Sequence, residues 1–533
     1  MHYYKQERDI LISEDEWDLV VIGGGATGLG TALDAASRGF KTLLLEQSDF
    51  AKGTSSRSTK LVHGGVRYLA QGDISLVYQA LKERGRLQVN AAHVVSKEEF
   101  IIPCFSWISV AKYLAGLKMY DWLSGKYSFG KSRFLSRKEV SAKIPGLNDK
   151  GLLGGISYFD GKFDDARLAV NIAQTCIEQG GKVFNYVKVT GLLKDKDSRI
   201  SGVEAHDTIT GRHHKIYSKA VVNATGVFVD EILQMNVPNA EKLVRPSQGV
   251  HVVLDNSFLN SESALMIPET SDKRVLFAVP WHSRLLVGTT DTPIETQSLE
   301  PRALEEEIDF ILSTASQYFK REVKRKDVLS VFAGLRPLAA PGKNDSNSTK
   351  EISRDHKLIV SDSGLITITG GKWTTYRKMS EETVNQVIRT AKLESRKCVT
   401  TDLKIHSSEV SDSASHMKIY GSDREFIEQL VKENPEWGSK LHPDFPNIKA
   451  EVVWAARNEM AYTIEDVLAR RLRILFIDVR AAIEMSEEVA KLMAVECNKS
   501  LAWVDEQVNE FRSMANQYIL DPAMEPEEII ISK

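Results

Sequence analysis

Cysteine, long apolar runs and excess charge are all scarce in this sequence. Only four cysteines occur among the 533 residues, and none forms a Cys-x-x-Cys pair. The sequence therefore predicts neither a disulfide framework nor a zinc cluster, and no metal site is expected. No stretch of about 18 uncharged apolar residues is present, so we expect no transmembrane helix. The formal net charge of −3 provides no basic field, and nucleic acid is not expected as a partner.

Two segments bear on the cellular location of the protein. Residues 1–16 form a polar tail without the apolar stretch of a signal peptide, so we expect no secretory leader. Residues 100–122 come closest to an apolar run, and they combine six aromatic residues with Lys112 and Lys118. We favour an ordinary helix whose aromatic side chains lie in the core. The alternative is a segment that rests in a membrane interface.

The beginning of the chain has the pattern of an α/β fold. Residues 18–22 are a short apolar, β-branched run that ends in glycines, which is typical of a buried parallel strand. A helix is expected over residues 27–38 and a second strand over residues 41–46. These elements begin a βαβ unit. Residues 48–69 are rich in glycine, serine and threonine, and a long loop beside a nucleotide motif is usually functional.

The rest of the chain divides into a long mixed body and a helical end. Thr463 with Asp466 resembles a capping box in the helical end. The expected domains are a polar tail (1–16), a catalytic body (17–397), a linker (398–422) and a helical C-terminal domain (423–533). The body is expected to hold helices at 74–95 and 164–179, strands at 152–158, 183–192, 220–223, 250–254, 275–279, 285–288, 358–360 and 365–369, and a polar surface loop at 341–350. The C-terminal helices are expected at 423–433, 450–459, 463–473, 481–497 and 501–516.

A G-x-G-x-x-G motif follows the first strand and opens the first helix. Gly23 permits the tight turn, Gly25 lets a pyrophosphate approach the backbone, and Gly28 lets helix and strand pack closely. The helix N-terminus supplies N–H donors to the phosphates. Glu46, at the end of the second strand, can accept hydrogen bonds from ribose hydroxyls. The motif predicts a dinucleotide site without deciding between FAD and NAD.

A second glycine turn lies far along the chain. The residues Thr-Gly-Gly-Lys at 369–372 follow an expected strand and precede an expected helix. A helix N-terminus aimed at a flavin would stabilise negative charge on the reduced ring. The same residues also fit a simple strand-to-helix turn, so this segment alone leaves both interpretations open.

Five motifs in one order make the sequence specific. They are TSSRSTKLVHGGVRYL at 54–69, VNATG at 222–226, GTTD at 288–291, GLRPL at 334–338 and GGKWTTYR at 370–377. Each resembles a segment of the FAD-dependent glycerol-3-phosphate dehydrogenases, and they follow the order of that family. The resemblance extends from residue 18 to residue 379, and the C-terminal helices are similar to the family's accessory domain.

The resemblance implies a fold and an activity. The fold is a Rossmann-like FAD-binding domain built from separated segments, with an antiparallel sheet over the flavin that forms the substrate pocket. The activity is oxidation of sn-glycerol 3-phosphate to dihydroxyacetone phosphate with a non-covalent FAD, and with electrons passed to membrane quinone. We expect a cytoplasmic protein or one that is peripheral on the inner membrane face. A homo-oligomer is left open.

Oxidation of a phosphate-bearing alcohol requires cations and a base. We expect Arg67 and Lys372 to bind the phosphate with Tyr68 as a neutral donor, because arginine offers a planar fork and lysine a point charge. By resemblance, Arg336 faces the glyceryl hydroxyl, where a cation stabilises the developing alkoxide. His251 is the preferred base, because histidine has a suitable pKa and can reach a hydroxyl proton.

A second histidine and several small residues are expected near the flavin. His63 is the rival base, although its glycine-rich loop places it against the flavin ring. The resemblance implies further cofactor contacts at Ser55, Ser56, Gly226, Gly371 and Thr374.

Three alternatives remain. An oxidase on the same fold would pass electrons to oxygen and form peroxide; by resemblance such oxidases carry an inserted segment on the substrate side, and none is evident here. A relative that oxidises amines or hydroxy acids would bind a carboxylate. A non-catalytic nucleotide- or partner-binding protein would use the C-terminal cluster of Arg470, Arg471 and Arg473 to dock a partner, although a solvated helix face is the ordinary interpretation of such a cluster.

Overall fold

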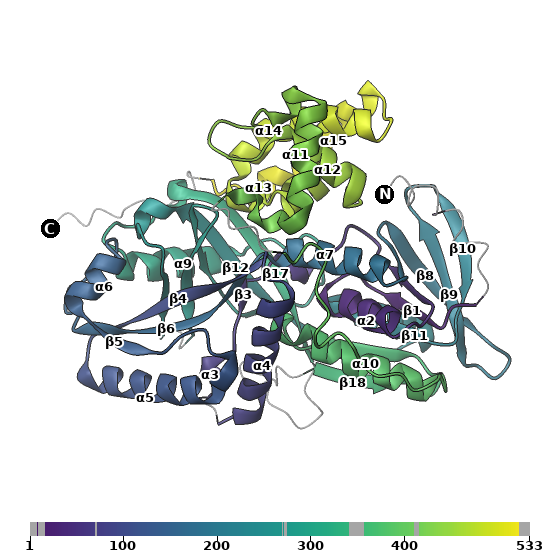
Figure 1. Cartoon of the computed structure of the whole chain (residues 1–533), viewed down its shortest axis with the longest axis horizontal. Helices are drawn as coiled ribbons and strands as arrows, with labels where there is room; N and C mark the ends of the chain where they lie inside the picture. Colours follow the sequence, from purple (N-terminus) through teal and green to yellow (C-terminus); the bar gives the residue numbers. More distant parts are fainter. Residues whose placement is uncertain are drawn as a thin grey trace.

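The computed structural model describes residue 8 and residues 16–69, 72–268, 270, 274–339, 356–409 and 415–521. A parallel sheet with its helices and a large mixed sheet lie side by side, and the C-terminal helices form a cap above them (Figure 1). This arrangement confirms the predicted fold class. The loop expected at 341–350 and nearly all of the expected tail lie outside the described residues.

The parallel sheet has the strand order β18-β19-β11-β1-β2-β7. Neighbouring strands are parallel except β18, which runs antiparallel to β19. Every residue of β1 and β2 is buried, as their unbroken apolar runs predict for strands covered on both faces. The strands span Leu19–Ile22 (β1), Thr42–Leu45 (β2), Lys182–Phe184 (β7), Val221–Asn223 (β11), His356–Val360 (β18) and Ile366–Gly370 (β19).

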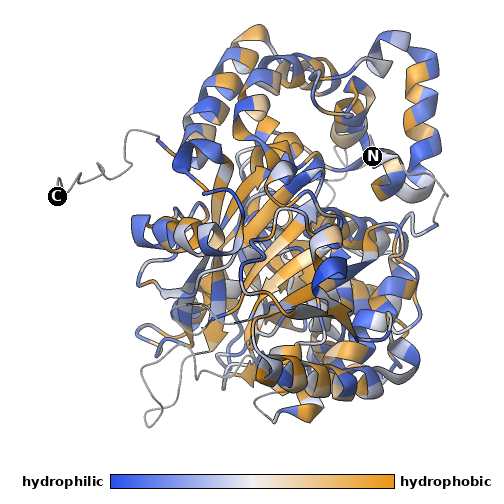
Figure 2. Ribbon diagram, turned by 90° about the vertical axis from the view of Figure 1, so that its left-hand side faces the viewer, coloured by the Kyte–Doolittle hydropathy of each residue, from blue (hydrophilic) through white to orange (hydrophobic). Residues whose placement is uncertain are grey.

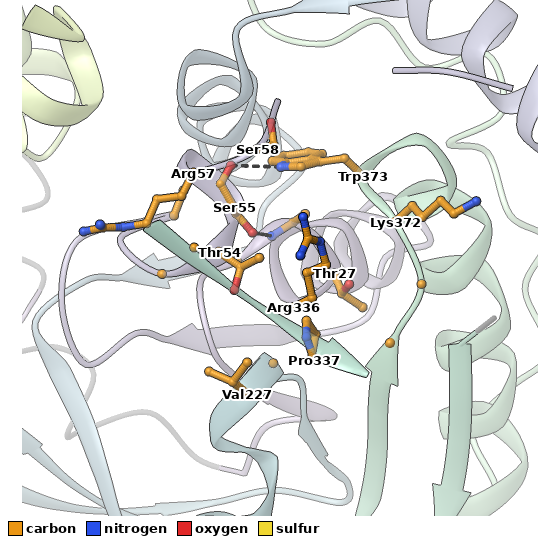
Figure 3. A pocket seen from close by; sticks show the side chains of 18 of the residues that line it. Thr27, Thr54, Ser55, Arg57, Ser58, Val227, Arg336, Pro337, Lys372 and Trp373 are labelled. Carbon is orange, nitrogen blue, oxygen red and sulfur yellow. Dashed lines mark hydrogen bonds between the residues drawn. The ribbon is translucent and has the colours of Figure 1, made fainter. Parts of the chain in front are cut away.

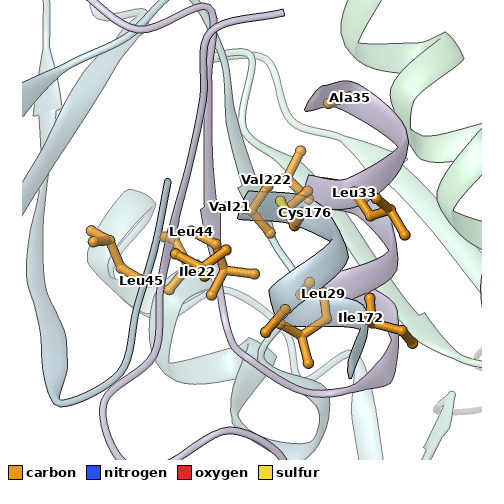
Figure 4. Close-up of a cluster of buried hydrophobic side chains, with 14 of the residues drawn as sticks. Val21, Ile22, Leu29, Leu33, Ala35, Leu44, Leu45, Ile172, Cys176 and Val222 are labelled. Carbon is orange, nitrogen blue, oxygen red and sulfur yellow. The ribbon is translucent and has the colours of Figure 1, made fainter. Parts of the chain in front are cut away.

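Three helices cover this sheet: α2 (Ala26–Ser37), α7 (Asp165–Glu178) and α10 (Tyr376–Thr390). In Figure 4, Leu29 of α2 lies beside Ile172 of α7 in the apolar core next to β1 and β2. Burial of each such side chain stabilises the fold by roughly 1.5–3 kcal/mol. This core fixes the turn between β1 and α2, where the glycine motif lies.

The large sheet follows the order β16-β12-β15-β14-β13-β4-β6-β3, with β17 paired to β12 and β5 to β6. Its pairs are antiparallel except for β13 and β4, so one parallel pair interrupts the antiparallel sheet that the resemblance implied. Hydrophobic residues dominate its central strands (Figure 2). The strands span Leu61–Val62 (β3), Val95–Cys104 (β4), Arg133–Ser136 (β5), Gly154–Phe163 (β6), Val244–Asp255 (β12), Ala264–Ile267 (β13), Leu276–Trp281 (β14), Arg284–Gly288 (β15), Thr292–Pro293 (β16) and Val328–Ala339 (β17).

Several expected elements have different bounds in the structure, and the difference has a clear reason in two of them. The helix expected over 74–95 ends at Asn90, because a strand of the large sheet begins at Val95. The strand expected over 183–192 is divided at Tyr186, whose φ of +61° is incompatible with a continuous strand. The remaining elements are a three-stranded antiparallel sheet of β8 (Val187–Lys194), β9 (Ile200–Asp207) and β10 (Arg212–Tyr217), and the helices α3 (Val66–Leu69), α4 (Ile74–Asn90), α5 (Trp107–Ser124), α6 (Arg137–Lys143), α8 (Val229–Asn236) and α9 (Glu305–Tyr318).

The cap consists of helices from residue 416 onward. Thr463 N–H donates to Asp466 Oδ2 (3.0 Å) and Asp466 N–H donates to Thr463 Oγ1 (3.2 Å), which confirms the expected capping box. The helix expected over 463–473 contains a π-helical segment, and such wide turns are frequent at functional positions. The cap elements are η8 (His416–Asp423), α11 (Arg424–Glu433), η9 (Pro435–Gly438), α12 (Lys449–Asn458), η10 (Asp466–Arg471), α13 (Ile474–Ile477), α14 (Val479–Glu496), α15 (Leu501–Ala515) and η11 (Asn516–Tyr518).

The described part of the expected linker packs against the catalytic body. The Thr400 hydroxyl donates to Asp34 Oδ1 (2.8 Å), and Ile405 N–H donates to the carbonyl of Asn90 (2.9 Å). His406 forms ion pairs with Glu178 of α7 and, at 2.9 Å, with Asp423 of the cap. The linker therefore joins the body to the cap through a titratable ring.

Replacing His406 with Gln should lower stability in a pH-dependent way. Burial opposes protonation of His406, but Asp423 and Glu178 outweigh it and raise its pKa from 6.5 to about 9. The stabilisation is therefore complete below pH 6.5 and is lost as the pH rises through 9. At about 1.4 kcal/mol per pKa unit, reduced for partial exposure, we expect a loss of about 2 kcal/mol near pH 6 and little near pH 10. Urea unfolding at both pH values tests this, and equal losses would contradict it.

Helix α5 exposes apolar residues on its outer side. Tyr120 is buried against the body, whereas Trp107 is 65% exposed and Trp122 is 80% exposed. The favoured interpretation, with the aromatic side chains in the core, is wrong for these two tryptophans, because a helix that is apolar on all sides can bury only the side that packs. Residues 100–104 of the same segment belong to β4. None of the helices among the described residues is long and apolar enough to cross a membrane.

Candidate functional site

A cavity of about 460 Å³ is lined by residues of both the parallel and the large sheet. Figure 3 shows Ser55, Arg336, Lys372 and Trp373 around it. The fold therefore gathers residues from all the separated motifs of the sequence. The predicted site residues that line it are Gly23, Gly25, Glu46, Ser55, His63, Tyr68, Gly226, His251, Arg336, Gly371 and Lys372.

The first glycine turn shapes one wall of the cavity. Gly23 has a φ of +108°, and a Cβ there would lie 2.7 Å from the carbonyl oxygen of Ala224. Gly28 does not line the cavity, but a Cβ on it would lie 1.9 Å from the Gly23 oxygen, so it permits the predicted close packing of helix and strand. Gly25 is the N-cap of α2 and provides no side-chain cap, and the N–H of Ala26 donates to Ser55 Oγ (3.0 Å). The helix N-terminus beside Gly25 thus suits a phosphate group.

Glu46 lies at the end of β2, in the position expected for ribose recognition. Gly24 N–H donates to Glu46 Oε2 (2.6 Å), and Ser48 N–H donates to Oε1 (2.9 Å). Burial raises the pKa of Glu46 despite these two hydrogen bonds. The carboxyl group is held rigidly at the cavity wall, while its contact with ribose stays a prediction.

Two further turns expose bare backbone to the cavity. Gly226 has a φ of +62°, and a Cβ there would meet nothing within 4 Å, so the backbone is open to a ligand. Gly371 has a φ of +73°, which a side chain would strain. Trp373 Nε1–H donates to the carbonyl of Ser55 (2.9 Å), which joins this turn to the loop after the glycine motif (Figure 3). Open backbone beside a helix N-terminus fits a dinucleotide cofactor with an aromatic ring.

Two predicted cofactor contacts lie behind the cavity wall. Thr374 Oγ1 accepts a hydrogen bond from His63 N–H (3.2 Å) and does not line the cavity. The side chain of Ser56 is fully buried and is also absent from the lining. The side chains of Ser56 and Thr374 therefore lie outside the cavity lining, and their flavin contacts stay predictions.

Arg336 projects from β17 into the cavity. Its guanidinium lies over Gly249, where a Cβ would come within 2.3 Å of Nη2. Nη1 donates to the carbonyl of Gln248 (3.2 Å), and Nη2 donates to Thr289 Oγ1 (3.0 Å). Asp291 lies 3.7 Å away and offsets part of the charge. The cation is therefore held in one orientation at the cavity wall.

Lys372 and Tyr68 form a second polar group at the cavity. The ammonium of Lys372 lies 3.7 Å from the centre of the Tyr68 ring, a cation–π contact. Both residues line the cavity, as expected for phosphate recognition. Arg67 lies on α3, but its side chain is outside the described residues, so its phosphate contact stays a prediction.

His251 lies on β12 at the same wall. Its ring stacks on Phe332 with centres 5.1 Å apart, and its Nε2 lies 2.9 Å from Thr59 Oγ1. Burial, together with the positive charges of Lys60 and Arg336, holds the pKa of His251 well below its usual value. The ring is therefore neutral near pH 7 and can accept a proton, but it is a weaker base than an ordinary histidine.

The arginine cluster of the cap is buried rather than solvated. Asp49 accepts hydrogen bonds from Arg470 Nε (2.5 Å) and from Arg471 Nη1 (2.6 Å) and Nη2 (2.9 Å). Arg473 reaches Asp165 at 2.8 Å. The side chains of all five are at most 1% exposed, so both sequence-based interpretations, a solvated face and a docking site for a partner, are wrong. Asp49 and Asp165 lie more than 300 positions away in the sequence, so no local signal indicates them. Arg470 also pairs with two nearby carboxylates, Glu465 (2.6 Å) and Asp466 (2.7 Å).

Comparison with known proteins agrees with this geometry. Residues 18–377 match the family described as FAD dependent oxidoreductase, and residues 364–507 match the C-terminal domain of alpha-glycerophosphate oxidase. A Caenorhabditis elegans protein named probable glycerol-3-phosphate dehydrogenase, mitochondrial, is 40% identical to this chain, across 94% of the chain and 73% of its own length. The chain belongs to the FAD-dependent glycerol-3-phosphate dehydrogenase family.

Solved structures support the fold of this dehydrogenase family. The glycerol-3-phosphate dehydrogenase of Bacillus halodurans complexed with FAD is 32% identical, with a TM-score of 0.79 across 98% of this chain and 99% of that one. The L-alpha-glycerophosphate oxidase of Mycoplasma pneumoniae with FAD bound is 16% identical, with a TM-score of 0.55 across 73% of this chain and 98% of that one. The second likeness concerns the fold alone.

Family membership decides the cofactor that the glycine motif left open. The cofactor of this dehydrogenase family is FAD. In this chain the α2 N-terminus beside Gly25, the carboxyl group of Glu46 and the open backbone at Gly226 and Gly371 are the groups that would hold it. The five motifs therefore identified both the family and its cofactor from the sequence.

Proposed function

We propose that this protein oxidises sn-glycerol 3-phosphate to dihydroxyacetone phosphate and passes the electrons to membrane quinone. The observation that carries the proposal is a single cavity that places Arg336, Lys372 and His251 beside the dinucleotide turn. A phosphate-bearing secondary alcohol needs one cation for the phosphate, a second for the oxygen at C2, and an acceptor for its hydroxyl proton. For a carboxylate substrate, which carries less charge than a phosphate, this set of cations would be less expected.

Each group has a distinct task in this reaction. FAD, when bound, accepts the hydride that leaves C2. Lys372 with Tyr68 binds the phosphate, and Arg336 stabilises the negative charge that develops on the C2 oxygen. Neutral His251 takes up the hydroxyl proton, while His63 belongs to the loop that packs on Thr374. The site thus separates binding, charge stabilisation and proton removal among different residues.

The electron acceptor distinguishes the dehydrogenase from an oxidase on the same fold. Turnover of sn-glycerol 3-phosphate should be measured with a water-soluble quinone analogue and, separately, with oxygen alone while peroxide is monitored. We expect quinone reduction and little peroxide. Rapid peroxide formation would indicate the oxidase, and a protein without flavin or turnover would support the non-catalytic alternative.

A membrane quinone can accept electrons only from a protein that reaches the membrane, and α5 has a surface suited to that contact. Trp107, Ile108 and Trp122 are more than half exposed on its outer side. Lys112 of α5 is exposed, and so is Lys126 in the turn that follows the helix. Aromatic and aliphatic side chains combined with lysines are typical of a helix that lies in the interface of an anionic bilayer. We therefore place a peripheral membrane contact at α5.

A double substitution of Trp107→Ser and Trp122→Ser should abolish this contact. In a flotation assay with anionic liposomes, the floating fraction should fall about tenfold, because burial of each ring is worth well over 1.4 kcal/mol. The matched control is Phe426→Ser, which alters an aromatic residue that is 60% exposed on the cap. Turnover with a water-soluble quinone should not change. A wild-type protein that stays at the bottom, or a double variant that floats equally well, would contradict the assignment.

A further inference from the structure

The Thr59 hydroxyl lies between the cavity and His251. Thr59 is half-buried and lines the cavity, and its Oγ1 lies 2.9 Å from His251 Nε2. The two residues are 192 positions apart in the chain. The Thr59 hydroxyl is thus the polar group that stands between the cavity and Nε2 of His251.

His251 offers no open nitrogen to a substrate. A Cβ on Gly288 would lie 2.4 Å from His251 Cδ2, so that ring edge packs against β15, and Phe332 stacks on the ring. Nδ1 is buried and has no hydrogen-bond partner among the described residues. Nε2 faces Thr59. A proton that leaves a ligand in the cavity can therefore reach the ring through the Thr59 hydroxyl.

The residues on both sides of Thr59 are anchored to one buried carboxylate. Asp165 Oδ2 accepts hydrogen bonds from Ser58 N–H (3.1 Å), the Ser58 hydroxyl (2.7 Å) and Lys60 Nζ (2.8 Å). Lys60 and Asp165 have no exposed side-chain surface. Because its two neighbours are directed toward Asp165, the Thr59 side chain is left directed toward His251.

The cap completes this anchor. Arg473 donates to Asp165 Oδ1 (2.8 Å) and to the carbonyl of Ser56 (2.9 Å), and Lys60 Nζ donates to the same carbonyl (2.7 Å). The segment around Thr59 is therefore fixed from two domains. A group that passes a proton from a substrate to a base must stay within hydrogen-bond distance of both, and this rigidity keeps it there.

We propose that Thr59 relays the substrate's hydroxyl proton to His251, an inference that rests on the proposed function. The substrate O–H bond breaks as its proton passes to Thr59 Oγ1, and the proton of the Thr59 hydroxyl passes to His251 Nε2, so the threonine is unchanged. The C2–H bond breaks with departure of the hydride, the chemistry assigned above to FAD, and C2 becomes a ketone carbon. Arg336 stabilises the C2 oxygen during this transfer. Thr59 is thus a catalytic residue that contacts the substrate.

The test compares Thr59→Val, which keeps the shape and loses the hydroxyl, with Thr59→Ser, which keeps the hydroxyl. Flavin reduction by sn-glycerol 3-phosphate is followed by anaerobic rapid mixing of the holoenzymes. We expect reduction about 100-fold slower in Thr59→Val and within about fivefold of wild type in Thr59→Ser. The dissociation constant of dihydroxyacetone phosphate, read from perturbation of the oxidised flavin band, should stay within about threefold in both. A purely structural role would instead weaken ligand binding.

A double variant tests whether the two residues act in series. Thr59→Val combined with His251→Gln should be no slower than His251→Gln alone, because removal of either one already interrupts the relay. A further large loss in the double variant would overturn the relay. So would Thr59→Val reducing its flavin at nearly the wild-type rate, or Thr59→Ser being as slow as Thr59→Val. A wild-type flavin that the substrate never bleaches would overturn the proposed function itself.

Discussion

Replacing Arg336 with Met should lower kcat by about 10²- to 10³-fold. The guanidinium is fixed over Gly249 by Gln248 and Thr289 and lines the cavity beside His251. Loss of one preorganised donor to a developing oxyanion has an effect of this size. The phosphate contact is assigned to Lys372, so KM should change much less than kcat. Steady-state kinetics with a quinone analogue measures both quantities.

Two matched variants show whether the Arg336 effect is specific. Arg284→Met removes an arginine of the same sheet that pairs with Asp255 and does not line the cavity, and it should leave kcat nearly unchanged. Arg336→Lys keeps a cation but loses the planar fork, so it should recover part of the rate. If Arg336→Met retains kcat within about threefold of wild type, charge stabilisation at C2 does not depend on this residue.

Replacing Asp49 with Asn should lower the free energy of unfolding by about 3–5 kcal/mol. Burial alone would raise the pKa of Asp49, but Arg471 and Arg470 outweigh it and lower the pKa, so the carboxylate is charged at neutral pH. Its removal leaves the fully buried Arg471 without its close carboxylate, a change that typically costs this much. Arg470 loses one of three carboxylate partners and keeps Glu465 and Asp466. Urea unfolding followed by circular dichroism measures the loss.

An exposed ion pair in the same cap serves as the control. Glu428→Gln breaks the pair with Arg424, which is one turn away on the surface of α11, and should cost less than about 0.5 kcal/mol. A similar small loss for Asp49→Asn would show that the buried cluster does not join the cap to the catalytic body. The Asp49 contribution should also disappear at low pH, since its stabilisation is lost as the pH falls through the lowered pKa.

The local sequence pattern was sufficient to predict the start of the parallel sheet and the glycine turn of the site. The apolar run of β1, the glycines after it and the start of α2 follow one another within the chain, so their spacing alone predicts the turn that Gly23 and Gly25 form. Two of the motifs then supplied Arg336 and Lys372, and His251 was predicted separately as the base; all three line the same cavity. Their individual roles stay predictions.

Contacts between distant segments could not be predicted in the same way. The burial of Arg470 and Arg471 depends on Asp49, and the orientation of Thr59 depends on His251 and Asp165. A charge cluster near the C-terminus is ordinarily solvated. Glu465 and Asp466 stand close to it in the sequence, but nothing there indicates that Asp49 completes a buried cluster. The prediction that Trp107 and Trp122 lie in the core was wrong for a related reason. Apolar residues on every side of α5 leave no periodicity that identifies its buried face.

The most direct test of the account is the visible spectrum of the purified protein under anaerobic conditions with sn-glycerol 3-phosphate. The account predicts a flavin band that this substrate bleaches, that glycerol without the phosphate does not bleach, and that a quinone analogue restores. A flavin band that persists at saturating sn-glycerol 3-phosphate would contradict the assigned substrate, and a protein that carries no flavin would contradict the site itself.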